Sequence, residues 1–230
     1  MLDMEYNRTS PFISNCLHYS SEFHPYVGEF IYLCPMNASP EYTSRDYTVS
    51  LPADEYIAVY RDARRFAACC RACPNYGRSW ACPPFEFNVE EYLSGYRTAL
   101  IIATKVTPLQ SGMLLSETER LLRPERVRHE RMLLDLEQRF GGRAFAYAGR
   151  CLYCPEGSCT RPEGRPCRHP EWVRPSLEAC GFDLGRTTEE LMGIPLRWGE
   201  GDRMPEYLTL VSGFFHNAGQ IDLTKYQQER

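Results

Sequence analysis

The chain has 230 residues, 43% of them hydrophobic and 13% aromatic, which is enough for the core of one large globular domain or two small ones. Its 26 Lys and Arg residues against 30 Asp and Glu residues give a formal net charge of −4, and no basic tract interrupts this balance. A mildly acidic chain of this kind argues against general binding of nucleic acid or of anionic membranes, because both need a basic surface.

The N-terminal part differs in composition from the rest. Residues 1–44 are rich in Tyr, Pro, Ser and Asn without a regular period, so we expect a loop-rich extension with a strand at Glu29–Leu33. Residues 45–230 are expected to form a single cysteine-rich α/β domain. The first residues are partly acidic and lack the apolar stretch of a signal peptide, and no apolar run approaches the ~20 residues that span a bilayer. We therefore expect a cytoplasmic protein, in which disulfides are disfavoured.

Three elements are expected before residue 97. Arg45–Leu51 alternates polar and apolar residues, which predicts a short strand. Asp54–Ala68 has helix formers throughout, with apolar residues at helical spacing, and predicts one helix. Asn88–Tyr96 predicts another helix with Asn88 as its N-cap.

The middle of the chain contains the clearest strand. Ala99–Val106 is a continuous apolar run that predicts a buried strand. Ser116–Phe140 is helical by composition, and Pro124 is expected to divide it or to start a new helix. Arginines and glutamates alternate over its first half, which predicts a solvent-exposed helix face.

The last third of the chain continues the alternation of strands and helices. Arg143–Ala148 and Glu206–Phe215 predict strands, and Thr187–Met192 predicts a short helix with Thr187 as its N-cap. The order of elements favours an α/β fold, with a mixed sheet and flanking helices, and two cysteine-rich loops.

Eight of the eleven cysteines lie in two short windows, Cys69–Cys82 and Cys151–Cys167. Clustered cysteines in a reducing compartment are better explained as metal ligands or redox thiols than as disulfide staples. Thiolates are the typical ligands of zinc and of iron–sulfur clusters. The windows therefore predict a metalloprotein.

The first window, CCRACPNYGRSWACPPF, offers a C-x2-C pair, Cys70 and Cys73, followed by Cys82. Two intervening residues allow both sulfurs of the pair to turn toward one centre. Cys69 adjoins Cys70, and neighbouring residues do not easily face one metal, so Cys69 is expected to be a spare thiol or a residue of the core. Three thiols leave one coordination position open, which Cys34, a histidine or a small ligand could complete.

The second window, CLYCPEGSCTRPEGRPC, supplies four thiols within a compact, turn-rich segment. They belong to Cys151, Cys154, Cys159 and Cys167. Four sulfurs satisfy either a [4Fe–4S] cluster or a tetrahedral zinc ion. The staggered spacing and the repeated Cys-Pro pairs favour iron–sulfur over zinc, because structural zinc sites usually combine two well-separated cysteine pairs. Cys16, Cys34 and Cys180 are isolated and are expected to be packed as small hydrophobes.

The two windows and their surroundings resemble a prokaryotic family of predicted metal-binding proteins, domain of unknown function 2284. The likeness covers roughly residues 45–215 and includes CRACPNYGRSWACPPF and CTRPEGRPCRHPEWVRPSLEACGFDL. It implies that seven cysteines are metal ligands: Cys70, Cys73, Cys82, Cys151, Cys154, Cys159 and Cys167. Four further residues match the family form and either hydrogen-bond to cluster sulfurs or hold the loop: Arg168, His169, Arg174 and Glu178.

Motifs for nucleotide binding and for hydrolytic chemistry are missing from the sequence, so no catalytic residue is assigned and enzymatic activity stays open. The leading hypothesis is an iron–sulfur protein with an electron-transfer or redox-accessory role, which serves a redox partner protein and binds neither nucleic acid nor membrane. The alternatives are a zinc-stabilised structural or interaction module, and an enzyme that uses a three-cysteine cluster with an open iron.

Overall fold

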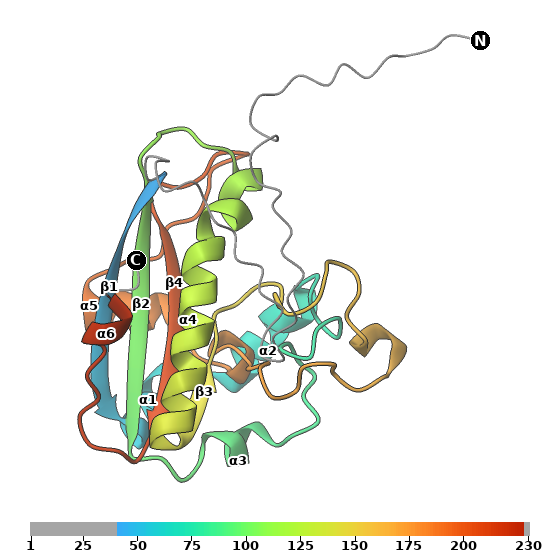
Figure 1. The fold of residues 1–230 in the computed structure, drawn as a ribbon, viewed down its shortest axis with the longest axis vertical. Coiled ribbons are helices and arrows are strands. Elements are labelled where there is room, and N and C mark those ends of the chain that lie inside the picture. The colour runs from blue at the N-terminus through green and yellow to red at the C-terminus, as the bar shows by residue number, and fades with distance from the viewer. Residues whose placement is uncertain (1–40, 228–230) are drawn as a thin grey trace, which may run out of the picture. The chain divides into compact units, whose positions relative to one another are not determined.

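The computed structural model describes residues 41–227, which form a four-stranded antiparallel sheet with helices on both of its faces (Figure 1). The regular elements are, in chain order, β1 (Tyr42–Pro52), α1 (Ala53–Tyr60), α2 (Ala63–Ala72), α3 (Val89–Leu93), β2 (Thr98–Pro108), η1 (Leu115–Glu117), α4 (Thr118–Phe140), β3 (Gly142–Phe145), η2 (Arg161–Glu163), η3 (Glu178–Cys180), α5 (Leu184–Met192), β4 (Leu208–His216) and α6 (Thr224–Gln227). The strand expected at Glu29–Leu33, together with Cys16 and Cys34, lies outside the described residues.

The sheet has the strand order β1-β2-β4-β3, and each neighbouring pair is antiparallel. Three of the predicted strands, those within β1, β2 and β4, are confirmed, and so is the α/β class. The strand expected at Arg143–Ala148 is shorter and covers Gly142–Phe145, so β3 is a short edge strand. The chain leaves the sheet directly after β3 and enters the second cysteine window.

Successive residues of β2 enter different cores because side chains alternate between the two faces of a strand. Ile101 packs on the face covered by α1 and α5, where Tyr56 and Phe182 stack with ring centroids 4.8 Å apart. Ile102 packs on the opposite face, which α4 and α6 cover. The helices and the sheet therefore form three layers.

The helix expected over Asp54–Ala68 is wrong, because the chain breaks it into α1 and α2. Arg61 has an extended backbone (φ −110°, ψ 126°) and pairs as an isolated antiparallel bridge with Phe182. Asp62 then caps α2 by accepting a hydrogen bond from the backbone N–H of Arg65 at 2.9 Å. The break lets α2 pack against η3, which brings the cysteines at the end of α2 next to the segment before α5.

Helix α4 runs without interruption through Pro124, so the expected division is wrong. Pro124 lies on the exposed side of the helix, where water can solvate the carbonyl group that loses its partner. The expected solvent-exposed charged face is also wrong in part, because Glu125, Arg126 and Arg128 are buried. Arg128 forms ion pairs with Asp46 of β1 at 2.7 Å and with Glu125 at 2.8 Å.

Of the two predicted N-caps, Asn88 is confirmed and Thr187 is wrong. Asn88 caps α3 as expected, accepting from the N–H of Glu90 at 2.8 Å. Helix α5 begins earlier than expected, at Leu184, and its cap is Asp183. Thr187 is fully buried inside that helix, and its hydroxyl donates to the carbonyl of Asp183 at 2.7 Å. Within residues 41–227, each helix is too short or too polar to cross a membrane.

Candidate metal centre

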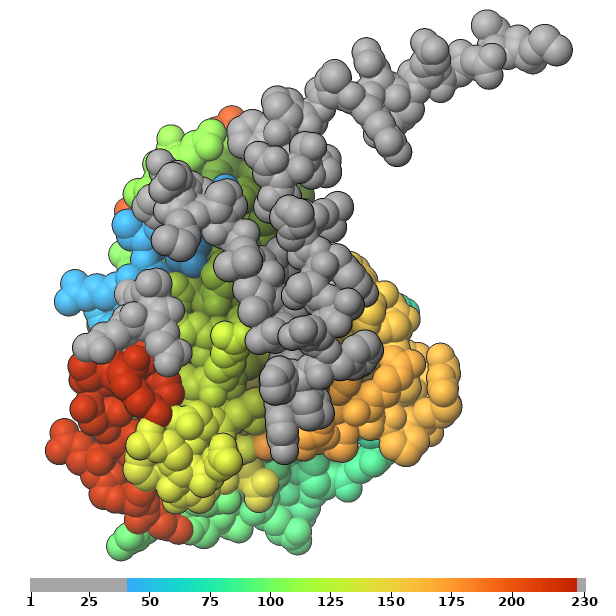
Figure 2. All heavy atoms as spheres, in the orientation of Figure 1, coloured from blue at the N-terminus to red at the C-terminus, as the bar shows by residue number. Residues whose placement is uncertain are grey.

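The two cysteine windows lie side by side at the β3 edge of the sheet, next to α2 (Figure 1). The first window leaves the end of α2 and the second follows β3. The indole N–H of Trp80 in the first window donates to the hydroxyl of Thr160 in the second at 3.3 Å. Figure 2 shows this face of the molecule, with the second window in gold and orange beside the green segment that follows α2.

Arg161, which lies between Cys159 and Cys167, connects the windows most strongly. Its guanidinium donates to the main-chain carbonyls of Ser79 at 3.2 Å and Cys82 at 3.1 Å, and also to that of Pro84. It also lies 4.7 Å from the centre of the Trp80 ring. The sequence analysis did not single out Arg161, because its partners are main-chain carbonyl groups that no sequence pattern marks.

The first window folds back on itself after α2. The N–H of Cys73 donates to the carbonyl of Cys70 at 3.0 Å, which closes the last turn. Gly77 then adopts a positive φ of +67°, and its N–H donates to the carbonyl of Pro83 at 2.8 Å. This reversal returns Cys82 toward the end of α2.

Electrostatic effects show that the three predicted ligands of the first window are neighbours. Burial, together with smaller contributions from the thiolates of Cys73 and Cys70, raises the pKa of Cys82 to about 11. Burial also raises the pKa of Cys70, again with a contribution from Cys73. Thiols of this kind hold their protons at neutral pH, and a bound cation would replace those protons.

The second window borders a cavity of about 380 Å³, which is lined by all four of its cysteines, Cys151, Cys154, Cys159 and Cys167. Its opposite wall is formed by the segment between Pro74 and Trp80 of the first window. All four predicted ligands of the second window therefore face one space.

Hydrogen-bond donors reach the sulfurs of the second window. The backbone N–H of His169 donates to Cys167 Sγ at 3.4 Å, and the guanidinium of Arg168 lies 3.9 Å from Cys154 Sγ. Burial raises the pKa of Cys151 to about 12, and the neighbouring thiols of Cys154 and Cys167 contribute to the rise. Donors to sulfur favour the thiolate form that a metal requires.

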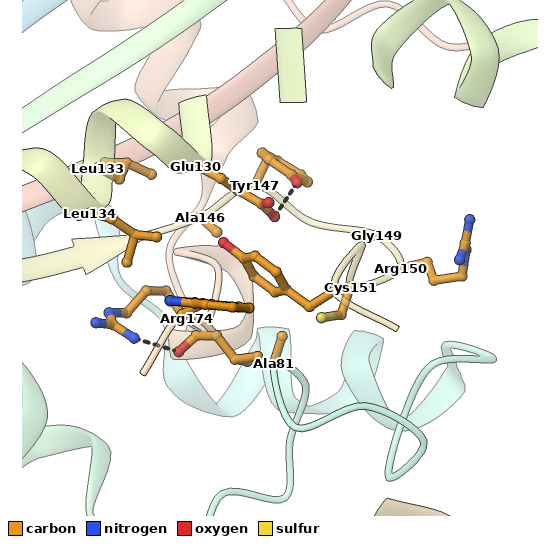
Figure 3. A pocket seen from close by; sticks show the side chains of 13 residues that line it. Ala81, Glu130, Leu133, Leu134, Ala146, Tyr147, Gly149, Arg150, Cys151 and Arg174 are labelled. Atoms are coloured by element: carbon orange, nitrogen blue, oxygen red, sulfur yellow. Dashed lines mark hydrogen bonds between the residues drawn. The ribbon is translucent and has the colours of Figure 1, made fainter. Parts of the chain in front are cut away.

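Residues of helix α4 lie beside the start of the second window (Figure 3). The guanidinium of Arg126 donates to the carbonyl of Arg150 and lies 4.4 Å from the centre of the Tyr147 ring. The hydroxyl of Tyr147 donates to the carboxylate of Glu130 at 2.5 Å, and Cys151 lies at the other side of the same small cavity, of about 20 Å³. The backbone just before Cys151 is therefore hydrogen-bonded to α4.

The described cysteines form no disulfide, and their sulfurs do not converge on one ion site. All nine described cysteines are free, so none of them forms a disulfide. Within residues 41–227, no three Cys, His, Asp or Glu side chains converge closely enough to hold a single metal ion. In the second window, all four cysteines instead border one cavity.

The remaining residues that sequence reasoning considered have distinct positions. Cys69 is exposed, so it is not a core residue. Cys180 is buried in the hydrophobic core, as expected for a packed small residue. Arg174 holds the fold through an ion pair with Glu137 at 2.5 Å, whereas Arg168 reaches both Cys154 Sγ and, at 2.7 Å, the carbonyl of Ser158.

Glu178 of η3 approaches the first window. Its charge contributes to the raised pKa of Cys70, after burial and the Cys73 thiolate. Burial raises the pKa of Glu178 itself to about 7, although hydrogen bonds from its own backbone and from the side chain of Ser176 act to lower it. Its Oε2 atom is inaccessible to solvent and has no hydrogen-bond partner.

A family model described as "Predicted metal-binding protein (DUF2284)" matches residues 55–212, a range that contains both cysteine windows. The chain belongs to this family. Neither a curated protein nor a solved structure matches it. The family description supports metal binding and leaves the identity of the metal open.

Proposed function

We propose that this member of the predicted metal-binding family is an iron–sulfur protein with an electron-transfer or redox-accessory role. One [4Fe–4S] cluster would be bound by Cys151, Cys154, Cys159 and Cys167. The observation that carries the proposal is that these four thiols line a single cavity of about 380 Å³. Four thiolates are the number that such a cluster requires.

The spacing of the thiols favours a cluster over a single zinc ion. Zinc draws its four ligands to about 2.3 Å from one point, which leaves no hollow between the sulfurs. In residues 41–227 the thiols surround a space and no three of them converge on one ion site. A cluster fills such a space, because its own iron and sulfide atoms lie between the cysteine sulfurs.

The surroundings of the cavity suit a redox centre. Arg78, Arg150 and Arg168 line it, and their charges would offset the negative charge of a thiolate-bound cluster. The reduced state carries one more negative charge, so these arginines favour reduction. Bound there, a cluster would supply one-electron chemistry.

The partial exposure of the four second-window cysteines supports exchange of electrons with a partner protein. Each of the four cysteines is only partly buried, so the centre would lie near the surface. Its arginine-lined opening fits a partner with an acidic contact surface.

The first window is proposed as a second metal site. Cys70, Cys73 and Cys82 lie close enough to influence one another electrostatically, and the groups that shift the pKa of Cys70 and Cys82 include Arg161 but no thiol of the second window. The two windows therefore favour two separate centres rather than one shared centre.

Anaerobic purification followed by analysis of iron, sulfide and zinc tests the proposal. We expect a brown protein with about four iron and four sulfide per filled second window, and an electron paramagnetic resonance signal after reduction. Cys154→Ser should lose this signal, and the matched variant Cys69→Ser should retain it. A colourless protein with stoichiometric zinc, which unfolds when zinc is chelated, would instead support the zinc-stabilised module.

A further inference from the structure

A third cavity lies beside the first window. It has a volume of about 280 Å³ and is lined by residues of α2, of the first window and the segment after it, and of η3. This volume is close to the lower end of the roughly 300–1,000 Å³ that small-molecule sites in proteins have. The cavity is therefore large enough for one small organic molecule.

Helix α2 presents mostly small side chains to this cavity. Ala63, Ala67, Cys70 and Arg71 line it, and their spacing places them on one face of the helix. None of the residues of α2 is buried. The apolar face of this helix therefore borders the cavity instead of packing fully into a core.

Gly181 allows the opposite wall, at the end of η3, to lie close to α2. It has a φ of +97°, and a Cβ atom at this position would be 2.8 Å from the Cα of Ala63. The N–H of Asp62 donates to the carbonyl of Gly181 at 2.8 Å, which connects the start of α2 to the end of η3. Because Ala63 and Gly181 both line the cavity, their contact closes one of its ends.

Aromatic residues form a further wall. Phe85 and Phe87 line the cavity, and their rings stack with centroids 4.6 Å apart. Phe87 also stacks on Tyr92 at 4.5 Å, and it is still 38% exposed. Covering exposed aromatic surface with a flat apolar group is favourable. This wall therefore fits a ligand with an aromatic ring.

The charged residues that line the cavity are two arginines, Arg61 and Arg71, and no acidic residue of the described chain joins them. Arg61 is already engaged, because its guanidinium forms two hydrogen bonds with Glu90, at 2.8 and 2.7 Å, and a third with the carbonyl of Cys180 at 2.7 Å. Arg71 is exposed, and within residues 41–227 its side chain forms neither an ion pair nor a hydrogen bond. Arg71 thus leaves the cavity with an unbalanced positive charge.

We propose that this cavity binds a small aromatic acid, with its ring against Phe85 and Phe87 and its carboxylate paired with Arg71. A guanidinium suits a carboxylate because the two groups can form parallel hydrogen bonds. The inference goes beyond the proposed function and does not require a metal in the first window. Cys70 lines the same space, so the bound acid lies next to one of the candidate metal ligands.

The test measures binding of 4-fluorophenylacetate by fluorine NMR, with the anaerobically purified full-length chain as it is isolated. We expect the fluorine signal to broaden and shift, with a dissociation constant of about 1 mM or lower for a ligand of this size. The neutral analogue 4-fluorophenylacetamide keeps the ring but lacks the charge. It should bind about tenfold more weakly, because it loses a charge-assisted interaction.

Two pairs of variants on α2 locate the bound acid. Ala67→Leu fills the cavity and should abolish binding of both compounds, whereas Ala68→Leu, at an exposed position outside the lining, should leave binding unchanged. Arg71→Gln should weaken binding of the acid about tenfold without changing that of the amide. Arg64→Gln removes another exposed arginine of α2 outside the lining and should change neither. Far-ultraviolet circular dichroism checks that each variant is folded.

The outcomes are decisive for the site and for the class of ligand. Undiminished binding of the acid to folded Ala67→Leu would overturn the site. Equal affinity for acid and amide, or an unchanged affinity for the acid in Arg71→Gln, would overturn the recognition of a carboxylate, and the Arg71 pair decides this even where Ala67→Leu does not fold. Absence of binding to the unaltered protein at about 10 mM of the acid would overturn the inference as a whole. The proposed function is decided separately, by the iron, sulfide and zinc content of the same protein.

Discussion

Replacing Arg161 by Gln should weaken metal binding in the first window, although Arg161 lies in the second. Its guanidinium donates to the carbonyls of Ser79, Cys82 and Pro84 and covers the ring of Trp80. Hydrogen bonds from charged groups contribute about 1.5–3 kcal/mol each when buried, and we take about 1 kcal/mol each here because the side chain is only partly buried.

The three bonds then stabilise the closed loop by about 3 kcal/mol. Without them, metal binding must also order the loop, so the cost appears as lost affinity. Since about 1.4 kcal/mol corresponds to a tenfold change, we expect roughly 100-fold weaker Co²⁺ binding at Cys70, Cys73 and Cys82.

Site-resolved alkylation during an anaerobic Co²⁺ titration measures this change. The matched control is Arg165→Ala, in the same loop, because Arg165 pairs only with the exposed Glu163 among the contacts described for it. Equal first-window affinities for Arg161→Gln and Arg165→Ala would refute the reasoning.

Three further changes probe other parts of the structure. Arg168→Gln should lower the reduction potential of a second-window cluster by roughly 20–60 mV, because it removes a positive charge beside Cys154 that stabilises the reduced state. Protein-film voltammetry would measure the potential, and an unchanged value would count against the cluster site. Gly181→Ala should lower the free energy of unfolding by at least about 1–2 kcal/mol, since alanine is strained at positive φ. A urea titration would measure it, and an unfolding midpoint equal to that of the unaltered protein would argue against tight packing of α2 on η3. First-window affinity for Co²⁺ should rise with pH from 6 to about 9, because burial raises the pKa of Cys82 to about 11 and binding must release its proton; a pH-independent affinity would mean that Cys82 is not a ligand.

Local patterns could predict the strands and the grouping of the second-window cysteines because both depend on neighbours in the chain. The apolar run of β2 and the spacing of the second-window cysteines are examples. Features that depend on distant partners could not be predicted in the same way. The break between α1 and α2 requires the bridge from Arg61 to Phe182, and the burial of Arg128 requires Asp46, 82 residues away.

The same reason explains what sequence reasoning missed in the candidate site. Arg161 contacts carbonyl groups 77–82 residues away, and every residue type offers such groups. Glu178 matched a family pattern, but the burial of its Oε2 atom without a hydrogen-bond partner depends on the tertiary structure around η3, which packs on α2.

The bond pattern of Arg161 has a consequence for assembly. Arg161 lies between Cys159 and Cys167 of the second window, and its hydrogen bonds also close the first-window loop that carries Cys82. Metal binding in the second window would restrict the segment around Arg161 and so reduce the conformational entropy that the first window loses when it binds metal. Each binding event therefore increases the affinity of the other site by the same factor. The protein should therefore acquire its metals cooperatively, and a chain with a damaged second window should mature poorly at both.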